Sequence, residues 1–269
     1  MFSKTRLAPT PSGYLHIGNI FSFLETQRVA NETGAAILLR IDDMDRGRVK
    51  KPLLEDIFET LRYLGIAWKE GPANVNDFEN HWTQRSRIER YHNILARLKQ
   101  SNLVYGCNCP RSKILLDVEG GYSGTCRNKK LPLEGEVCWR LKTGNDPVNV
   151  KRYGQQPLEA TLTPDMRDFV VRKKDGMPSY QLTSFADDLF FNVDLVVRGE
   201  DLWPSTLAQL YLAKLLGEDR FTGITFLHHR LLKDEQGRKL SKSAGHDSVK
   251  FLREQGTTRE EIIRMSLSG

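Results

Sequence analysis

At 269 residues, with 39% hydrophobic and 28% charged residues, the chain can bury a core in one large domain or in one domain with an insertion. It has no apolar run near 18 residues and no apolar signal core at the N-terminus, which excludes a membrane span and predicts a cytoplasmic protein. In that compartment the four cysteines are not expected to form disulfides.

The net charge of +6 is unevenly distributed along the chain. Residues 107–152 carry nine Lys/Arg against five Asp/Glu, and residues 228–253 carry seven against three. Two basic tracts on a near-neutral body favour a polyanion as partner. Charge alone leaves the alternative open that these residues form a solvated surface.

The first predicted element is a short strand around residue 6 that breaks at two prolines and a glycine and continues as a helix. The helix is expected from about His16 to Asn31, with Gly34 as its stop. A strand, a glycine turn and a helix N-terminus together form an anion site, because unpaired N–H groups and the positive end of the helix dipole face the ligand. His16 and Asn19 add donors there, and Gly18 allows a flat ligand to approach closely.

The next segments alternate between strands and helices. Residues 35–41 read as a strand buried on both faces, followed by the acidic run 42–46 at its carboxyl end, where open α/β sheets bind ligands. A helix is predicted from Pro52 to Gly65, and another over 83–100. This alternation predicts an α/β fold with a doubly wound parallel sheet.

From residue 103 the pattern breaks into a cysteine- and glycine-rich stretch, and we interpret 103–165 as an inserted module. The sheet is expected to resume with strands over 169–173 and 178–182, separated by an Asp175–Gly176 turn. The later expected elements are a helical segment through Phe185, strands over 193–198 and 224–229, a helix over 204–217, and one or two short C-terminal helices, with Thr258 and Glu261 as a capping box.

Two short motifs carry a family resemblance. His16–Asn19 reads HIGN, and Lys239–Ser243 reads KLSKS on a loop opened by Gly237. They resemble the HIGH and KMSKS signatures of class I aminoacyl-tRNA synthetases, in the expected order and more than 200 residues apart. The sequence around HIGN, with Leu-Arg-Ile-Asp-Asp-Met-Asp at 39–45, resembles the glutamyl branch of that class.

The resemblance implies a Rossmann-type catalytic domain whose sheet is split by a zinc-containing α+β module. The implied parts are residues 1–102, the first half of the catalytic domain; 103–165, the inserted zinc and acceptor-like module; 166–230, the second half; and 231–269, the KMSKS-like loop with a short helical stub. The implied reaction is the activation of glutamate by ATP, with Mg²⁺ accompanying the nucleotide.

The resemblance also implies which residues bind the substrates. His16 and Lys242 would be catalytic, with Lys242 meeting the departing pyrophosphate; Arg6 and Arg198 would bind the substrate carboxylates, and Tyr180 would pack against the amino acid. The implied ATP-binding residues are His16, Gly18, Asn19, Lys239, Ser241 and Lys242. The implied glutamate-binding residues are Arg6, Leu7, Ala8, Pro9, Thr10, Asp42, Tyr180 and Arg198.

Two observations bear on the assignment of the glutamate-binding residues. An arginine at a strand end is more often part of a structural ion pair, which is the alternative for Arg6 and Arg198. At Asp42, which would meet the substrate ammonium, the family usually has glutamate. Aspartate keeps the charge but shortens the side chain by one methylene.

The cysteines of the insertion predict a metal site. Cys107 and Cys109, followed by Tyr122 and Cys126, resemble the zinc site of glutamyl-queuosine tRNA(Asp) synthetases. Three thiolates form a soft ligand set suited to zinc, and either Tyr122 or a water would complete the shell. The alternative is that the cysteines pack as small hydrophobes, which is our expectation for Cys138.

Only 26 residues follow Ser243. This position of the second motif also favours a resemblance to the glutamyl-queuosine tRNA(Asp) synthetases. Such enzymes activate glutamate without tRNA and transfer it to the queuosine base in the anticodon loop of tRNA(Asp). We expect a monomer with ATP, glutamate and this tRNA as partners. The alternatives are a catalytic fragment of an ordinary glutamyl-tRNA synthetase and a non-catalytic paralogue that binds RNA or a nucleotide.

Overall fold

The computed structural model describes residues 1–110, 114, 116–232 and 248–268, so Lys239, Ser241 and Lys242 lie outside the described residues. The chain divides into two compact units. The first unit comprises Met1–Ser86, Val193–Asp201 and Phe226–Gly269; the second comprises Arg87–Asn192 and Leu202–Thr225. In the described part of the chain, every helix is too short or too polar to cross a membrane.

Short buried strands form the centre of the first unit. β1 (Lys4–Leu7) and β2 (Ala36–Leu39) pair in parallel, which confirms the predicted strand after the first helix. β8 (Leu195–Gly199) lies beside β1, and the backbone N–H of Asp194 donates to the carbonyl of Lys4 at 3.1 Å. β9 (Thr225–His229) is hydrogen-bonded to β8. The strands therefore place side chains from distant parts of the sequence next to one another.

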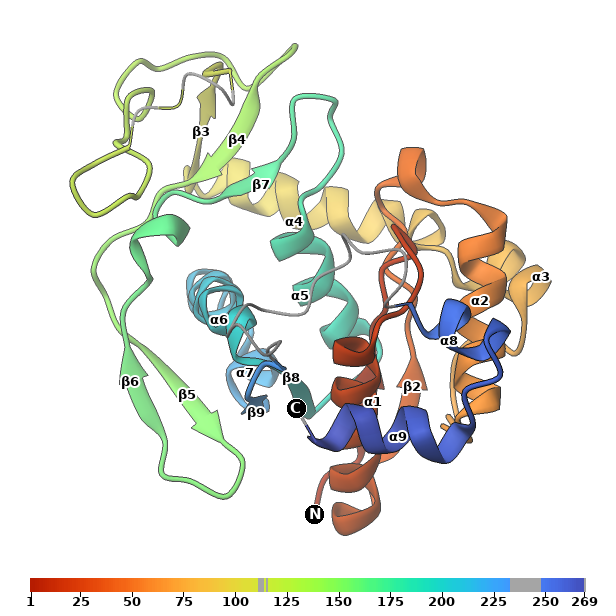
Figure 1. Ribbon diagram of the computed structural model, residues 1–269. Coiled ribbons are helices and arrows are strands. Elements are labelled where there is room, and N and C mark those ends of the chain that lie inside the picture. Colours follow the sequence, from red (N-terminus) through yellow and green to blue (C-terminus); the bar gives the residue numbers. More distant parts are fainter. Residues whose placement is uncertain (111–113, 115, 233–247, 269) are drawn as a thin grey trace. The chain divides into compact units, whose positions relative to one another are not determined.

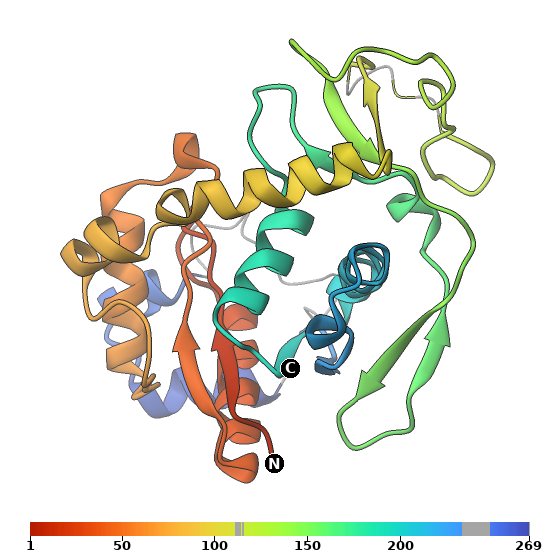
Figure 2. The same ribbon diagram turned by 180° about the vertical axis from the view of Figure 1, so that it is seen from behind.

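Helices cover these strands. α1 (Ile17–Thr33) lies against one face of the β1–β2 pair (Figures 1 and 2) and ends at Gly34, whose φ of 77° favours glycine. The predicted helix after Pro52 is confirmed as α2 (Lys51–Tyr63). The other helices are α3 (Val75–Asp77), α8 (Val249–Glu254) and α9 (Arg259–Ser268). The expected capping box precedes α9, since Glu261 accepts the Thr258 N–H at 2.8 Å.

The second unit combines helices with two sets of antiparallel strands. Its three-stranded sheet has the order β3–β4–β7, and β5 pairs antiparallel with β6. The strands are β3 (Val104–Cys107), β4 (Cys138–Leu141), β5 (Val148–Arg152), β6 (Leu158–Ala160) and β7 (Val170–Arg172), and the helices are α4 (Ile88–Gln100), α5 (Tyr180–Phe190), α6 (Trp203–Leu216) and α7 (Asp219–Thr222).

Short helical turns connect these elements. They are 3-10 turns at Arg46–Arg48, Gln84–Arg87, Pro164–Met166 and Glu200–Leu202, and a π-helical turn at Phe78–Trp82. The predicted insertion 103–165 falls within the second unit together with α4, α5 and α6. The four-part division of the chain stays a prediction.

The strand predicted over 178–182 is wrong. The turn at Gly176 forms as expected, and Pro178 makes one antiparallel bridge with Arg172. Tyr180 then begins α5, because the following buried residues Leu182, Phe185 and Ala186 recur at helical spacing.

Candidate active site and metal centre

The HIGN turn (residues 12–19) leads into α1. His16 is the N-cap, and its backbone N–H donates to Oδ1 of Asn19 at 3.1 Å. The Asn19 side chain therefore caps the first turn in addition to its predicted role with ATP. A Cβ on Gly18 would lie 3.0 Å from Cε1 of His16, so glycine leaves room for the imidazole over the first turn.

The predicted glutamate-binding segment runs beside the continuation of β2. The N–H of Arg40 donates to the Leu7 carbonyl at 2.8 Å, and the N–H of Asp42 donates to the Pro9 carbonyl at 2.9 Å. Residues 7–10, which also include Ala8 and Thr10, are thus held next to Asp42. The structure brings these predicted residues together in the first unit.

Asp42 forms a buried ion pair that the sequence analysis missed. Arg40 donates from Nε to Oδ1 at 2.7 Å and from Nη2 to Oδ2 at 3.0 Å, and both side chains are buried. Alternate residues of an extended chain lie on one side, so the Arg-x-Asp spacing was a usable signal. The pair fixes the orientation of the short aspartate side chain.

The neighbouring Asp43 has a structural role. It accepts the Gln84 N–H at 2.7 Å and pairs with Arg46 at 2.7 Å, and it is almost fully buried. Asp42 and Asp43 therefore have different partners within the acidic run after β2.

The two predicted carboxylate-binding arginines lie on neighbouring strands and are both buried. Arg6 donates from Nη1 to the Val197 carbonyl on β8 at 3.2 Å. The guanidinium of Arg198 lies 5.1 Å from the ring centre of Phe226 on β9. This arrangement concentrates positive charge at β1 and β8, as a site for a dicarboxylate requires.

His228 lies near these two arginines, and the sequence did not indicate it as a site residue. Its ring stacks on Phe226, with ring centres 6.1 Å apart and planes 16° apart. Burial is the main effect that lowers the pKa of His228 to about 3, and the charges of Arg198, His229 and Arg6 add to it. The imidazole is therefore neutral at pH 7 beside two arginines.

The other predicted site residues belong to the second unit or lie outside the described residues. Tyr180 is the first residue of α5 in the second unit, and 41% of its surface is exposed. Lys239, Ser241 and Lys242 lie outside the described residues. Their roles stay predictions.

The four predicted zinc ligands converge in the second unit. The sulfurs of Cys107, Cys109 and Cys126 all lie within 4.8 Å of one another, and the Cys109 and Cys126 sulfurs are 3.5 Å apart. The Tyr122 hydroxyl lies 3.4 Å from the Cys107 sulfur and 3.8 Å from the Cys109 sulfur. It also accepts the Cys126 N–H at 3.0 Å.

These separations fit a tetrahedral metal. With zinc–sulfur bonds of about 2.3 Å, ligand sulfurs lie about 3.8 Å apart, and a phenolate oxygen lies about 3.5 Å from each sulfur. Burial raises the pKa of the Cys107 thiol, but hydrogen bonds from Tyr122, the Cys109 backbone and Arg140 outweigh it and bring the pKa to about 6. The cluster of three thiols is thus compatible with zinc.

Cys138 lies beside this centre without joining the ligand set. It is buried opposite Cys107 in the β3–β4 pair, and its thiol donates to the Cys107 carbonyl at 3.2 Å. The expectation that Cys138 belongs to the core is confirmed. The guanidinium of Arg140 lies 3.7 Å from the ring centre of Tyr122 and orients that ring.

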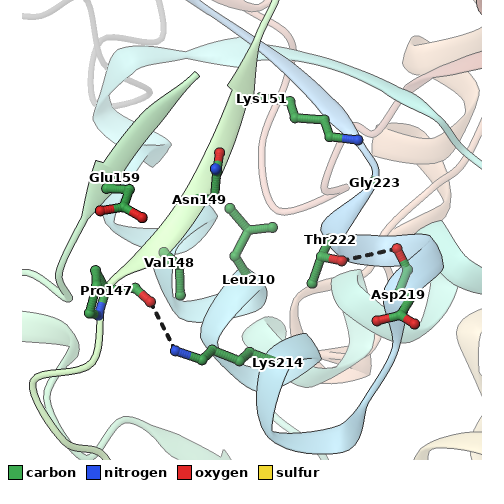
Figure 3. Close-up of a pocket in the computed structure, with 10 residues that line it drawn as sticks. All are labelled: Pro147, Val148, Asn149, Lys151, Glu159, Leu210, Lys214, Asp219, Thr222 and Gly223. Atoms are coloured by element: carbon green, nitrogen blue, oxygen red, sulfur yellow. Dashed lines mark hydrogen bonds between the residues drawn. The ribbon is translucent and has the colours of Figure 1, made fainter. Parts of the chain in front are cut away.

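A separate pocket of about 430 Å³ lies in the second unit between the β5–β6 hairpin and α6–α7 (Figure 3). Lys151 and Lys214 face it together with Glu159 and Asp219, and Lys214 donates to the Pro147 carbonyl at 3.1 Å. The balanced charges argue against a phosphate site. Among the described residues, none of the predicted ATP, glutamate or zinc ligands lines this pocket.

Comparison with known proteins shows to which family this chain belongs. Residues 3–121 and 123–267 match the catalytic domain of class I tRNA synthetases (E and Q). The chain belongs to this family. It therefore has a class I synthetase catalytic fold, Rossmann-like with mixed sheets and helices, and it is a member of an enzyme family.

Individual relatives show which members of this family the chain resembles. The chain is 33% identical to a glutamyl-Q tRNA(Asp) synthetase of Nitratidesulfovibrio vulgaris, over 96% of this chain and 83% of the relative. It is 30% identical to glutamate–tRNA ligase 2 of Syntrophus aciditrophicus, over 97% of this chain and 56% of that protein. A crystal structure of glutamate-tRNA synthetase from Elizabethkingia anophelis superimposes with a TM-score of 0.74 at 25% identity, covering 90% of this chain and 53% of the other. The chain thus spans about half the length of these last two class I synthetases.

Proposed function

We propose that this class I synthetase activates L-glutamate with ATP, without needing tRNA, and transfers glutamate to the queuosine base in the anticodon loop of tRNA(Asp). The observation that carries the first step is the juxtaposition of Arg6, Arg198 and the Arg40–Asp42 pair in the unit that contains the HIGN turn. The second step rests on relatives named glutamyl-Q tRNA(Asp) synthetase at 31–36% identity.

In the first step a carboxylate oxygen of glutamate attacks the α-phosphorus of ATP, and the bond to the β-phosphate breaks to release pyrophosphate. Arg6 and Arg198 bind the substrate carboxylates, and Asp42 receives the ammonium in the orientation fixed by Arg40. His16, Gly18 and Asn19 meet the triphosphate at the α1 N-terminus, together with Lys239, Ser241, Lys242 and Mg²⁺. The enzyme aligns two anions and stabilises the charge that develops on the phosphates.

The remaining roles are proposals of the same kind. Leu7–Thr10 and Tyr180 line the amino-acid site in a doubly wound Rossmann-type domain. One structural zinc ion is held by Cys107, Cys109, Cys126 and, as fourth ligand, Tyr122, within the module at 103–165. That the protein is a cytoplasmic monomer stays a prediction.

The test combines two assays. Glutamate-dependent ATP–pyrophosphate exchange without tRNA should occur, and a non-catalytic paralogue would show none. The enzyme is then given labelled glutamate with queuosine-containing tRNA(Asp), its unmodified transcript, or tRNA(Glu), and the products are cleaved with nuclease. Label is expected only in the anticodon-loop fragment of the modified tRNA. Label on the 3′-terminal adenosine of tRNA(Glu) would instead establish ordinary glutamyl-tRNA synthetase activity, the candidate favoured by similarity to the ligase of Syntrophus aciditrophicus.

Replacement of Lys242 by alanine should lower the exchange rate about 100-fold, because one charge-stabilising donor contributes about 3 kcal/mol in the transition state. The KM for glutamate should change little, since the contact forms as pyrophosphate leaves. The matched control is Lys99→Ala, at an exposed lysine in the last turn of α4. An unchanged rate in the Lys242 variant would remove this residue from the mechanism.

A further inference from the structure

Asp56 is a carboxylate on the buried face of α2. Only 2% of its surface is exposed, and it lies in sequence beside the core residues Leu54, Ile57 and Phe58. A buried charge is costly unless other groups stabilise it, so its partners indicate what the position requires. No predicted substrate or metal contact involves this residue.

The partners of Asp56 come from its own helix and from one distant segment. Arg253 on α8 pairs with Oδ1 at 3.3 Å, and the Thr60 hydroxyl donates to the same oxygen at 3.3 Å. Burial raises the pKa of Asp56, and the Arg253 charge is the main effect that opposes that rise by stabilising the ionised form. The carboxylate thus interacts with α8.

α8 also contacts the same short segment directly. The N–H of Val249 donates to the Leu15 carbonyl at 2.8 Å, and Ser248 forms an antiparallel bridge with His16. The Lys250 ammonium lies 4.7 Å from the ring centre of Tyr14 and 3.4 Å from its hydroxyl. Residues 14–16 therefore each have a partner among residues 248–250.

We propose that Asp56 and Arg253 are positioning residues for the HIGN turn: they hold α8 in place, and α8 in turn fixes the backbone of residues 14–16. The inference rests on the proposed role of His16 with ATP. A displacement of about 1 Å in a positioned group can lower a rate about 100-fold, so a shift of α8 that moves the backbone of His16 affects the reaction. The tie involves α2, α8 and residues 14–16, whereas Arg6 and Arg198 lie on β1 and β8.

The test is Asp56→Asn, which removes the charge at nearly constant volume. In glutamate-dependent exchange without tRNA, the KM for ATP should rise about 10-fold while the KM for glutamate stays unchanged. The matched control is Glu59→Gln, on the same helix. Glu59 pairs with the same Arg253 at 3.1 Å, but its side chain is 58% exposed. The control should leave both KM values unchanged.

Two further measurements keep the inference testable if Asp56→Asn folds poorly or if the proposed activity fails. Arg253→Met removes the partner of Asp56 at a more exposed position. In the double variant, the rise in the KM for ATP should be smaller than the two single effects combined, because the two residues form one network. Amide hydrogen exchange over residues 12–20 should become faster in Asp56→Asn and Arg253→Met and stay unchanged in Glu59→Gln.

The outcomes separate the two proposals. No exchange activity in the parent protein would overturn the proposed function, and faster amide exchange in the variants would still support the positioning role. Unchanged amide exchange over 12–20 in both variants would overturn the positioning role, whatever the activity. Equal rises in the KM for ATP and for glutamate, with a lower melting temperature, would show a general structural role and overturn it as well.

Discussion

Replacing Cys107 with serine is expected to lower the zinc content of the purified protein from about one ion per chain to nearly none. The three cysteine sulfurs lie within 4.8 Å of one another and the Tyr122 oxygen is 3.4 Å from the Cys107 sulfur, so loss of one thiolate would leave an incomplete ligand set. The melting temperature of the second unit should fall, because a structural metal contributes directly to folding. Metal analysis of protein prepared without chelator, with thermal unfolding, provides the measurement.

Cys138→Ser is the matched control for this prediction. Cys138 is buried in the same cluster, but its sulfur donates to the Cys107 carbonyl and stands outside the ligand set. The control should therefore retain zinc. Glutamate activation should remain measurable in both variants, since the first unit contains none of the four cysteines. If the parent protein contains no zinc, these cysteines are packing residues and not metal ligands.

Features set by local sequence could be predicted. The start of α1 after His16, its stop at Gly34 and the capping box at Thr258 follow from residue types within one turn of each other. The cysteine cluster was also predicted, because the Cys-x-Cys spacing and the glycine-rich loop before Cys126 indicated that the three thiols lie close together. In each case the information lies within about 20 residues.

Features that depend on distant partners could not be predicted in this way. Asp56 appears in sequence as one polar residue of an amphipathic helix, and only the fold brings Arg253 to it. His228 acquires its low pKa from burial and from arginines on two other strands. Tyr180 was assigned to a strand because the turn before it suggested a hairpin, yet the buried residues after it favoured a helix. Long-range packing decided the environments of Asp56 and His228, whereas the local helical spacing after Tyr180 decided its helix.

Replacing Arg198 with methionine is expected to raise the KM for glutamate about 100-fold, with a much smaller change in the KM for ATP. Removing one partner of a buried charge pair typically costs about 3 kcal/mol, and methionine preserves most of the packing against Phe226. The measurement is exchange kinetics at varied glutamate and at varied ATP. The matched control is Arg230→Met, since Arg230 also lies over a phenylalanine ring, 5.7 Å from the centre of Phe21, but is exposed.

A second readout distinguishes a local loss of charge from a general loss of structure. The Arg198 charge helps burial to hold the pKa of His228 near 3, so its removal should move that pKa upward, visible in an NMR titration of labelled histidines. Arg230→Met should leave the pKa of His228 in place, because that charge is not among its causes. If the His228 pKa rises in Arg198→Met while the KM for glutamate stays constant, Arg198 is a structural arginine near the imidazole, and the substrate carboxylates bind elsewhere.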